Sequence, residues 1–309
     1  MKNDIVPSGF ILFLFIFANL FLPEYAVAIG ISDGEISGEE TVHPQTDGEI
    51  PYATAAGILS FADYLYLEKD YQRALGEYQR YLFLFPTGRL DTVYLKVGMS
   101  LERAGNYAEA LDYFNTLSSG TTAFDIAHLA AYETALTYIR MGNYNEALKF
   151  LNSKSLPSYG EVYNAEIISS IGLLFLKEWK QAGLILENAL VPPGVELGKI
   201  AEQARGLTVK SPFVAAFFST FIPGLGKIYA GRWKDGLFSL VTVGLFAGLS
   251  AYNFYREGIY SVKGWIYGGL GAVFHIGNIY GSALAARQFN ELQHDKIFSE
   301  VWNFVDKYY

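Results

Sequence analysis

The chain has 309 residues and a formal net charge of -8, with 51% hydrophobic and only 17% charged residues. Soluble proteins are usually about one quarter charged, so part of the apolar surplus is expected in lipid. The acidic balance, without a basic stripe, argues against nucleic acid as a partner, and the absence of cysteine excludes disulfides, thiolate zinc sites and cysteine nucleophiles.

Residues 1–28 match a secretory signal peptide. Lys2 precedes an apolar run from Phe10 to Leu22, and the small-residue pattern Ala26-Val27-Ala28 follows. This order predicts export and cleavage after Ala28. An uncleaved anchor helix is the alternative, because the apolar run approaches the roughly 20 residues that span a bilayer.

Residues 29–52 are predicted to form a disordered acidic linker. They contain six acidic residues and no Lys or Arg. Such a stretch buries too little apolar surface to offset the entropy lost on ordering. A solvated leader is favoured over a binding tail.

Residues 53–208 contain a fourfold internal repeat. An aromatic residue recurs at intervals of 36, 37 and 35 residues, after an apolar helical pattern with a small residue and before a second helical pattern. This spacing predicts about four pairs of helices, each joined by a tight turn. The turn segments are Lys69–Ala74, Gly105–Ala110, Gly142–Ala147 and Lys177–Ala182, and the small residues are Ala62, Gly98, Ala135 and Ser170.

These segments resemble the tetratricopeptide repeat family, from about Ala53 to Leu190. A Gly-Asn pair would end the first helix in a left-handed cap, and the aromatic residue would begin the second helix. The fourth segment departs from the pattern, because it carries Trp179 and lacks the turn glycine. The resemblance implies an all-α solenoid in which the first helix of each pair lines a groove for a peptide or helix of a protein partner.

The same resemblance implies which side chains face that groove. Each of them has an alternative interpretation as a solvated residue or as one paired within the chain. The candidate partner contacts are Asp63, Tyr66, Glu102, Arg103, Tyr132 and Arg140.

Residues 209–286 are predicted to form a membrane domain, a helical hairpin or three-helix cluster. The apolar runs 237–255 and 265–286 each have about the length of a transmembrane helix. The shorter run 212–226 is either a third, short span or a re-entrant helix. Residues 287–309 show apolar side chains at helical spacing, which predicts an amphipathic helix that lies on the membrane or packs against the repeats.

A turn rich in glycine follows the short apolar run. It resembles the signature of the TM-two domain family over about residues 211–255, although it lacks the histidine often found there and a third hydrophobic segment follows. A phosphate-binding loop is rejected, because the glycine four residues earlier and the hydroxyl residue after Lys227 are missing. The turn residues are Pro223, Gly224, Gly226, Tyr229 and Gly231.

Small residues in the membrane region predict close helix contacts. The pairs Gly244/Gly248, Gly264/Gly268 and Gly277/Gly281 each lie on one helix face, and they could pack within one chain or join copies into a homo-oligomer. His275 lies in the middle of the second apolar run. It is either a functional group or a neutral imidazole paired to a neighbouring helix.

The basic residues favour three spans. If the repeats are exported and all three apolar segments cross, Arg232, Lys234 and Arg287 lie in the cytoplasm, against Arg256 and Lys263 outside. Two spans would place Arg232 and Lys234 outside, against the usual bias.

These features predict a scaffold that is not an enzyme and needs no metal or cofactor. It would lie in a bacterial inner membrane and act in envelope assembly, with periplasmic repeats that bind a protein partner and with the lipid bilayer as a second partner. The alternative is an integral subunit of a transport or insertion complex in which the glycine-rich helices are the working part.

Overall fold

The structure, a computed structural model, contains thirteen helices in its described residues and no strand beyond one isolated bridge between Tyr159 and Tyr163. The predicted all-α fold is therefore confirmed. One compact unit ends at Val195 and includes Tyr308–Tyr309, and the other is Glu196–Lys307. The predicted signal peptide and linker lie outside the described residues. The structure describes residues 54–87, 90–121, 123–160 and 162–309.

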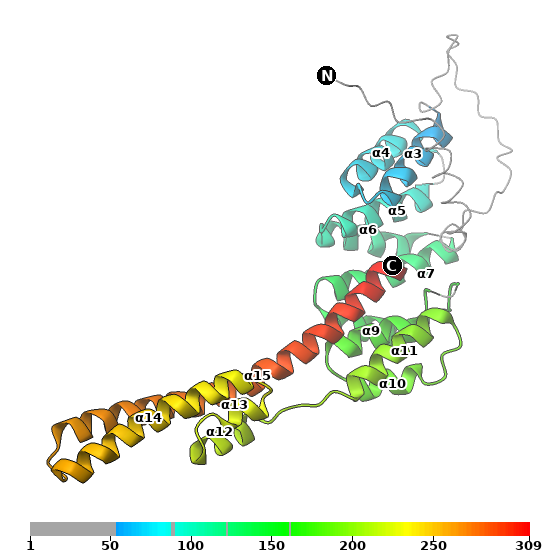
Figure 1. Ribbon diagram of the computed structural model, residues 1–309. Coiled ribbons are helices and arrows are strands. Elements are labelled where there is room, and N and C mark those ends of the chain that lie inside the picture. The colour runs from blue at the N-terminus through cyan, green and yellow to red at the C-terminus, as the bar shows by residue number, and fades with distance from the viewer. Residues whose placement is uncertain (1–53, 88–89, 122, 161) are drawn as a thin grey trace, which may run out of the picture. The chain divides into compact units, whose positions relative to one another are not determined.

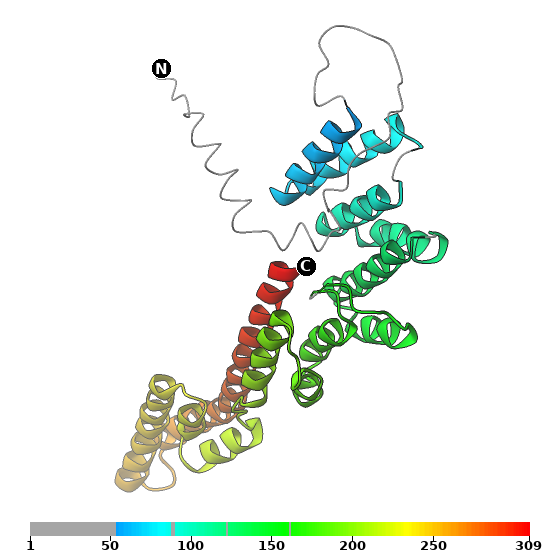
Figure 2. The same cartoon turned by 90° about the vertical axis from the view of Figure 1, so that its right-hand side faces the viewer.

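The first unit consists of helix pairs that follow one another along the chain, coloured blue to green in Figures 1 and 2. In every pair the second helix begins at the aromatic residue of the repeat, as the spacing predicts. The pairs are α3 (Ala55–Leu67) and α4 (Tyr71–Leu84), α5 (Leu90–Arg103) and α6 (Tyr107–Gly120), α7 (Phe124–Arg140) and α8 (Tyr144–Ser153), and α9 (Ala165–Phe175) and α10 (Trp179–Leu186).

The four turns have the same backbone geometry. Gly105 and Gly142 have φ values of 85° and 76°, and Lys69 and Lys177 adopt 62° and 64°. In each turn the next residue donates its N–H to the carbonyl five residues earlier, at 2.8 or 2.9 Å. The fourth pair therefore keeps the turn without a glycine, because a lysine enters the left-handed region at a cost of roughly 1–2 kcal/mol.

The small residues lie where helices approach one another closely. Ala62, Ala135 and Ser170 are fully buried. A Cβ atom on Gly98 would lie only 2.5 Å from the ring of Phe114. This arrangement confirms the packing predicted for these positions.

The second unit contains the apolar helices. Only α14, among the helices of the described residues, is long and apolar enough to cross a membrane. The predicted second span and the predicted C-terminal helix are parts of a single helix of 47 residues, α15. The unit contains α11 (Pro192–Arg205, from Glu196), α12 (Pro212–Phe221), α13 (Leu225–Tyr229), α14 (Trp233–Glu257) and α15 (Val262–Tyr308).

Helices α14 and α15 lie side by side (Figures 1 and 2). The rings of Phe246 and Phe274 stack with their centroids 5.2 Å apart. The Ser250 hydroxyl donates to the carbonyl of Gly264 at 2.8 Å. The C-terminal part of α15 also meets α11, because Lys307 Nζ lies 2.7 Å from a carboxylate oxygen of Glu196.

Candidate functional site

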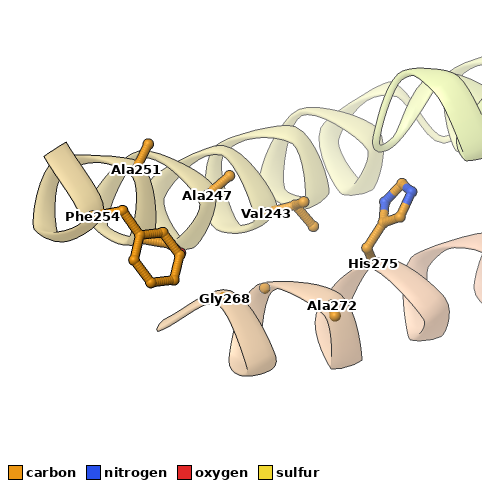
Figure 3. A pocket seen from close by; sticks show the side chains of 9 residues that line it. Val243, Ala247, Ala251, Phe254, Gly268, Ala272 and His275 are labelled. Atoms are coloured by element: carbon orange, nitrogen blue, oxygen red, sulfur yellow. The ribbon is translucent and has the colours of Figure 1, made fainter. Parts of the chain in front are cut away.

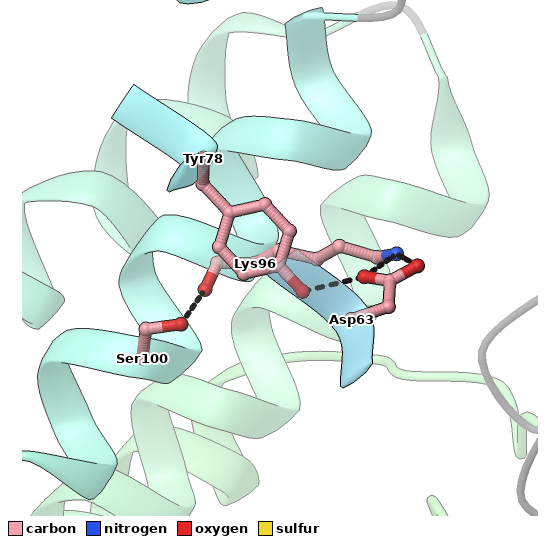
Figure 4. Close-up of polar contacts among 4 residues, drawn as sticks. All are labelled: Asp63, Tyr78, Lys96 and Ser100. Atoms are coloured by element: carbon pink, nitrogen blue, oxygen red, sulfur yellow. Dashed lines mark hydrogen bonds and ion pairs between the residues drawn. The ribbon is translucent and has the colours of Figure 1, made fainter. Parts of the chain in front are cut away.

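A polar cluster around Asp63 joins the first helix pair to the second (Figure 4). The ammonium of Lys96 on α5 donates to both carboxylate oxygens of Asp63, at 2.6 and 2.8 Å. The Tyr78 hydroxyl on α4 donates to the same carboxylate at 2.5 Å. Asp63 on α3 therefore connects both helices of its own pair to the next pair, and its acceptors are engaged within the chain.

A second cluster lies around Glu102, whose side chain is 1% exposed. The Nε of Arg140 on α7 lies 3.0 Å from one carboxylate oxygen of Glu102. The Nε of Arg103 lies 3.8 Å from the other oxygen. Removal of one partner from such a buried group leaves an uncompensated charge, so this cluster ties α5 to α7.

Glu133 on α7 brings a second carboxylate close to these arginines. It is buried and accepts a hydrogen bond from the hydroxyl of Tyr163. Burial raises the pKa of Glu133 to about 7 and repulsion from Glu102 adds to this shift, while the Tyr163 hydrogen bond and the charges of Arg103 and Arg140 oppose it. The cluster can therefore gain a proton near neutral pH.

The remaining predicted contacts are also turned inward. The Tyr132 hydroxyl donates to the carbonyl of Pro157 at 2.9 Å, and the Tyr132 side chain is fully buried. The Tyr66 hydroxyl is buried, and burial raises its pKa, whereas Arg103 lowers it. The structure thus brings Tyr66, Glu102, Arg103 and Arg140 together. Five of the six predicted residues form hydrogen bonds or ion pairs inside the unit, whereas the Tyr66 hydroxyl is buried without a hydrogen-bond partner among the described residues.

Two residues of these clusters, Lys96 and Glu133, were missed by the sequence reasoning. Each stands two positions before the small residue of its first helix, Gly98 or Ala135. Charged residues at one repeat position in consecutive layers are a signal that could have indicated them. Within the described residues, no three His, Asp or Glu side chains gather to hold a metal ion.

A comparison with protein families bears on these layers. A family model for the tetratricopeptide repeat matches residues 92–119, which include most of α5 and α6. The match covers one of the four helix pairs, and the other three pairs repeat the geometry of its turn. A fold of this kind suggests a protein-interaction scaffold.

A crystal structure of a tetratricopeptide repeat protein from Parabacteroides merdae is similar at 15% identity, covering 80% of this chain and 98% of that chain, with a TM-score of 0.36. No curated protein matches the chain. The comparisons give no support to the resemblance between residues 211–255 and the TM-two family.

Beyond the tetratricopeptide repeats, the predicted membrane turn is built by close backbone contacts. Gly224 has a φ of 88°, and a Cβ there would lie 1.9 Å from the carbonyl oxygen of Gly236. A Cβ on Gly226 would lie 1.8 Å from the carbonyl oxygen of Ala215. Glycine is therefore required for space at both positions, and α13 packs directly on α12 and α14.

The other turn residues complete this contact. Pro223 lies between α12 and Gly224. The Tyr229 hydroxyl accepts a hydrogen bond from the N–H of Ser211 at 3.1 Å. Gly231 has a φ of 84° and lies just before α14.

An open apolar groove of about 430 Å³ lies between α14 and α15 (Figure 3). Ala247, Ala251, Gly268 and Ala272 line it, and His275 lies at one end. One ring nitrogen of His275, Nε2, lies 3.1 Å from the carbonyl oxygen of Thr220 on α12. The imidazole is thus paired to a neighbouring helix, which is one of the two interpretations given above.

The predicted glycine pairs differ in their surroundings. Gly264 and Gly268 face Phe254 and Ser250, so this pair serves packing within the chain. Added Cβ atoms on Gly244 and Gly248 would meet nothing within 4 Å. At these two positions, α14 is open among the described residues.

Proposed function

We propose that the chain is a membrane-anchored scaffold of the bacterial cell envelope that binds a protein partner through its tetratricopeptide repeats. The observation that carries the proposal is the presence in one chain of a repeat array and of α14, a helix apolar enough to cross a membrane. The predicted signal peptide supports export of the repeats. The C-terminal unit would then hold them at the inner membrane.

The six residues predicted as partner contacts form the floor of the groove in this proposal. Their polar groups hold neighbouring layers together, so they shape the surface that a partner meets. The exposed side chains of α3 offer the contact itself. Tyr64 is 53% exposed and Leu67 69% exposed, and the ring of Tyr64 stacks on that of Phe61 with centroids 6.4 Å apart. Exposed aromatic residues are enriched where proteins bind one another.

Photocrosslinking in intact cells tests this surface. A photoreactive phenylalanine analogue replaces Tyr64 or Leu67, and the matched control replaces Phe83, which is 84% exposed on the second helix of the same pair. We expect a discrete protein adduct from α3 and none from Phe83. Absence of any adduct from α3 in membrane fractions would argue against a repeat-bound partner.

A second candidate function is an integral subunit of a membrane complex. The unoccupied face at Gly244 and Gly248 favours it, because small residues in lipid allow another helix to approach closely. In this case, a chain that lacks the repeats would still copurify with its complex. Loss of the complex on deletion of the repeats would contradict this function and favour the scaffold.

A further inference from the structure

The α12–α13 segment begins and ends at the same height along helix α15. Before α12, the N–H of Lys210 donates to the Asn290 side chain of α15 at 2.8 Å, and that side chain donates to the Lys210 carbonyl at 2.9 Å. After α13, Arg232 donates to the side chain of Gln288 at 2.9 Å. Both ends of the segment therefore lie beside residues 288–290 of α15.

Between these ends, α12 runs along α15 away from that level. The hydroxyls of Ser219 and Ser282 lie 2.7 Å apart, and the Thr220 carbonyl meets His275 at 3.1 Å. Since α15 is one continuous helix with a rise of about 1.5 Å per residue, the path from Asn290 to His275 covers roughly 22 Å. Ser282 lies roughly 12 Å from Asn290 on the same helix, so the end of α12 lies between the levels of Ser282 and His275, and side chains bridge the rest of the distance.

The segment then turns back. Gly224 contacts the backbone of Gly236 near the start of α14, and Lys227 Nζ donates to the Ser239 hydroxyl at 2.8 Å. Helix α13 therefore returns to the level of Arg232. With ten residues, α12 is about 15 Å long, which is half of the roughly 30 Å hydrocarbon core.

The turning point lies at mid-depth. Helix α14 has 25 residues and is about 37 Å long, enough to cross the hydrocarbon core. His275 lies midway along α15 between Val262, beside the turn that follows α14, and Gln288. The tip of the α12–α13 segment thus reaches the middle of the α14–α15 hairpin.

The outer face of α12 is apolar and uncovered. Phe213, Phe217 and Phe221 are 77%, 50% and 70% exposed, while Ala215 and Ser219 on the opposite face are buried. At the level where the segment enters and leaves, the charge is positive. Residues 207–236 contain four basic residues against one acidic residue in a chain of net charge -8. We define the cationic collar as Lys210, Arg232, Lys234 and Arg287.

We propose that α12 and α13 form a re-entrant hairpin that inserts into one leaflet, with the phenylalanine face against acyl chains and the cationic collar at anionic phospholipid headgroups. This inference rests on the membrane anchoring proposed above. The chain then crosses the membrane twice, through α14 and through the first half of α15, which is less apolar than α14 but contains no Asp, Glu, Lys or Arg from Gly264 to Ala286. The segment before α12 and the C-terminal half of α15 lie on the same side. This path replaces the three-span path that the basic residues favoured.

An independent contact supports the placement of these two parts of the chain on the same side of the membrane. Glu196 of α11 precedes the membrane segments and Lys307 follows them, yet their side chains form an ion pair at 2.7 Å. Three crossings would place these two residues on opposite sides of the bilayer. If the repeats are exported, the cationic collar faces the outer leaflet. A long domain that follows a signal peptide is translocated largely regardless of the charge of nearby loops.

Depth measurements test the hairpin, and the absence of cysteine from the chain allows single labels. Nitroxides are attached to Phe213→Cys, Phe217→Cys and Phe221→Cys in vesicles of phosphatidylcholine and phosphatidylglycerol, with Leu245→Cys in α14 as the deep control. We expect depth to increase from 213 to 221. Equal, shallow depths for the three α12 labels would overturn the hairpin but not the anchoring. The same holds if the α12 labels lie in water while the label at residue 245 lies deep in the bilayer. An aqueous label at 245 would overturn the anchoring as well.

Labelling with a membrane-impermeant maleimide tests the path. Thr208→Cys precedes α12, Asp295→Cys follows the membrane part of α15, and Tyr260→Cys lies between α14 and α15. We expect 208 and 295 to react from one side and 260 from the other. Reaction of 208 and 295 from opposite sides would overturn the two-crossing path.

The collar is tested by its lipid preference. Spin-labelled phosphatidylglycerol is compared with spin-labelled phosphatidylcholine around the reconstituted protein, using Lys234→Gln with Arg287→Gln and, as a charge-matched control, Lys149→Gln with Lys180→Gln on the repeats. Each collar cation is expected to change the preference about fivefold. An unchanged preference in the collar variant would overturn the assignment of anionic headgroups to this level.

Discussion

The turns of the repeats and the α12–α13 turn both contain left-handed residues, but they differ in the space around them. At Gly105 and Gly142 an added Cβ would meet nothing within 4 Å, and lysine takes the equivalent place in the other two turns. At Gly224 an added Cβ would overlap the backbone of Gly236. A glycine needed only for its φ can be replaced at a modest cost, whereas one needed for space cannot.

The interiors of the two units differ as well. The repeats bury carboxylates and guanidinium groups that pair between helices, as at Glu102 and Arg140. The second unit joins its helices through hydroxyls and backbone contacts, as at Ser219 and Ser282. In the repeats, loss of one partner would leave a buried charge uncompensated, whereas close backbone packing is typical of helices in lipid.

The largest effect is expected from Gly226→Ala. The new Cβ would lie 1.8 Å from the Ala215 carbonyl oxygen, so α13 would have to leave α12. We expect loss of more than about 3 kcal/mol of stability, which exceptional steric changes produce, measured as a lowered midpoint of thermal unfolding in detergent. Gly244→Ala, with open space around it, is the control and should leave the midpoint unchanged or raise it slightly, because alanine favours helix. A destabilised Gly244→Ala would show that another helix occupies that face.

The next effect concerns the buried carboxylate of the repeats. Because the folded pKa of Glu133 is about 7 against an ordinary 4.5, the folded state holds the proton more tightly than the unfolded state. Stability should therefore fall as pH rises from 4.5 to 7, by about 3 kcal/mol for this group. Glu133→Gln should remove this fall in unfolding measured between pH 5 and 8, while the exposed Glu109→Gln should retain it. An unchanged pH profile in Glu133→Gln would contradict the buried cluster.

A smaller loss is expected from Asp63→Ala. The substitution leaves Lys96 and the Tyr78 hydroxyl without their acceptor in a partly buried place, which costs about 1–3 kcal/mol. Denaturant unfolding measures the loss. The exposed pair of Arg80 and Glu77 provides a control, since Glu77→Ala should change stability by less than about 1 kcal/mol. Equal losses of stability from the two substitutions would contradict the role of Asp63 in joining α3 to α4 and α5.

The last and smallest changes in the free energy of unfolding are expected at two helical glycines of the repeats. Gly98→Ala should destabilise by about 1–3 kcal/mol, because the Cβ would press on the Phe114 ring. Gly76→Ala in α4 should stabilise by up to about 1 kcal/mol, since open space surrounds it and alanine favours helix. Both changes are read from the same unfolding curves. A shift of the same sign in both would contradict the packing described at Gly98.

The sequence predicts the four helix pairs because several local signals coincide in each of them. Tyr71, Tyr107, Tyr144 and Trp179 begin helices as expected, since small residues, turn and aromatic residue recur together. The sequence indicates two segments in α15 because the polarity changes near Arg287, but Ala285, Ala286 and Arg287 all favour helix, so α15 continues through them.

The candidate site could be predicted only in part. Positions facing the groove follow from the repeat, so Tyr66, Glu102, Arg103 and Arg140 were indicated. Their pairing with one another was not, because it depends on which side chains from successive layers meet across the groove. No periodicity in one chain reports such contacts between layers.

The most direct test of a membrane-anchored scaffold is the side on which its repeats lie. Reporters active only outside or only inside the cytoplasm can be fused after Leu190, at the end of the repeats. The account predicts activity of the external reporter alone. Activity of the internal reporter would contradict export, return the cationic collar to the cytoplasm and make a cytosolic protein the partner of the repeats.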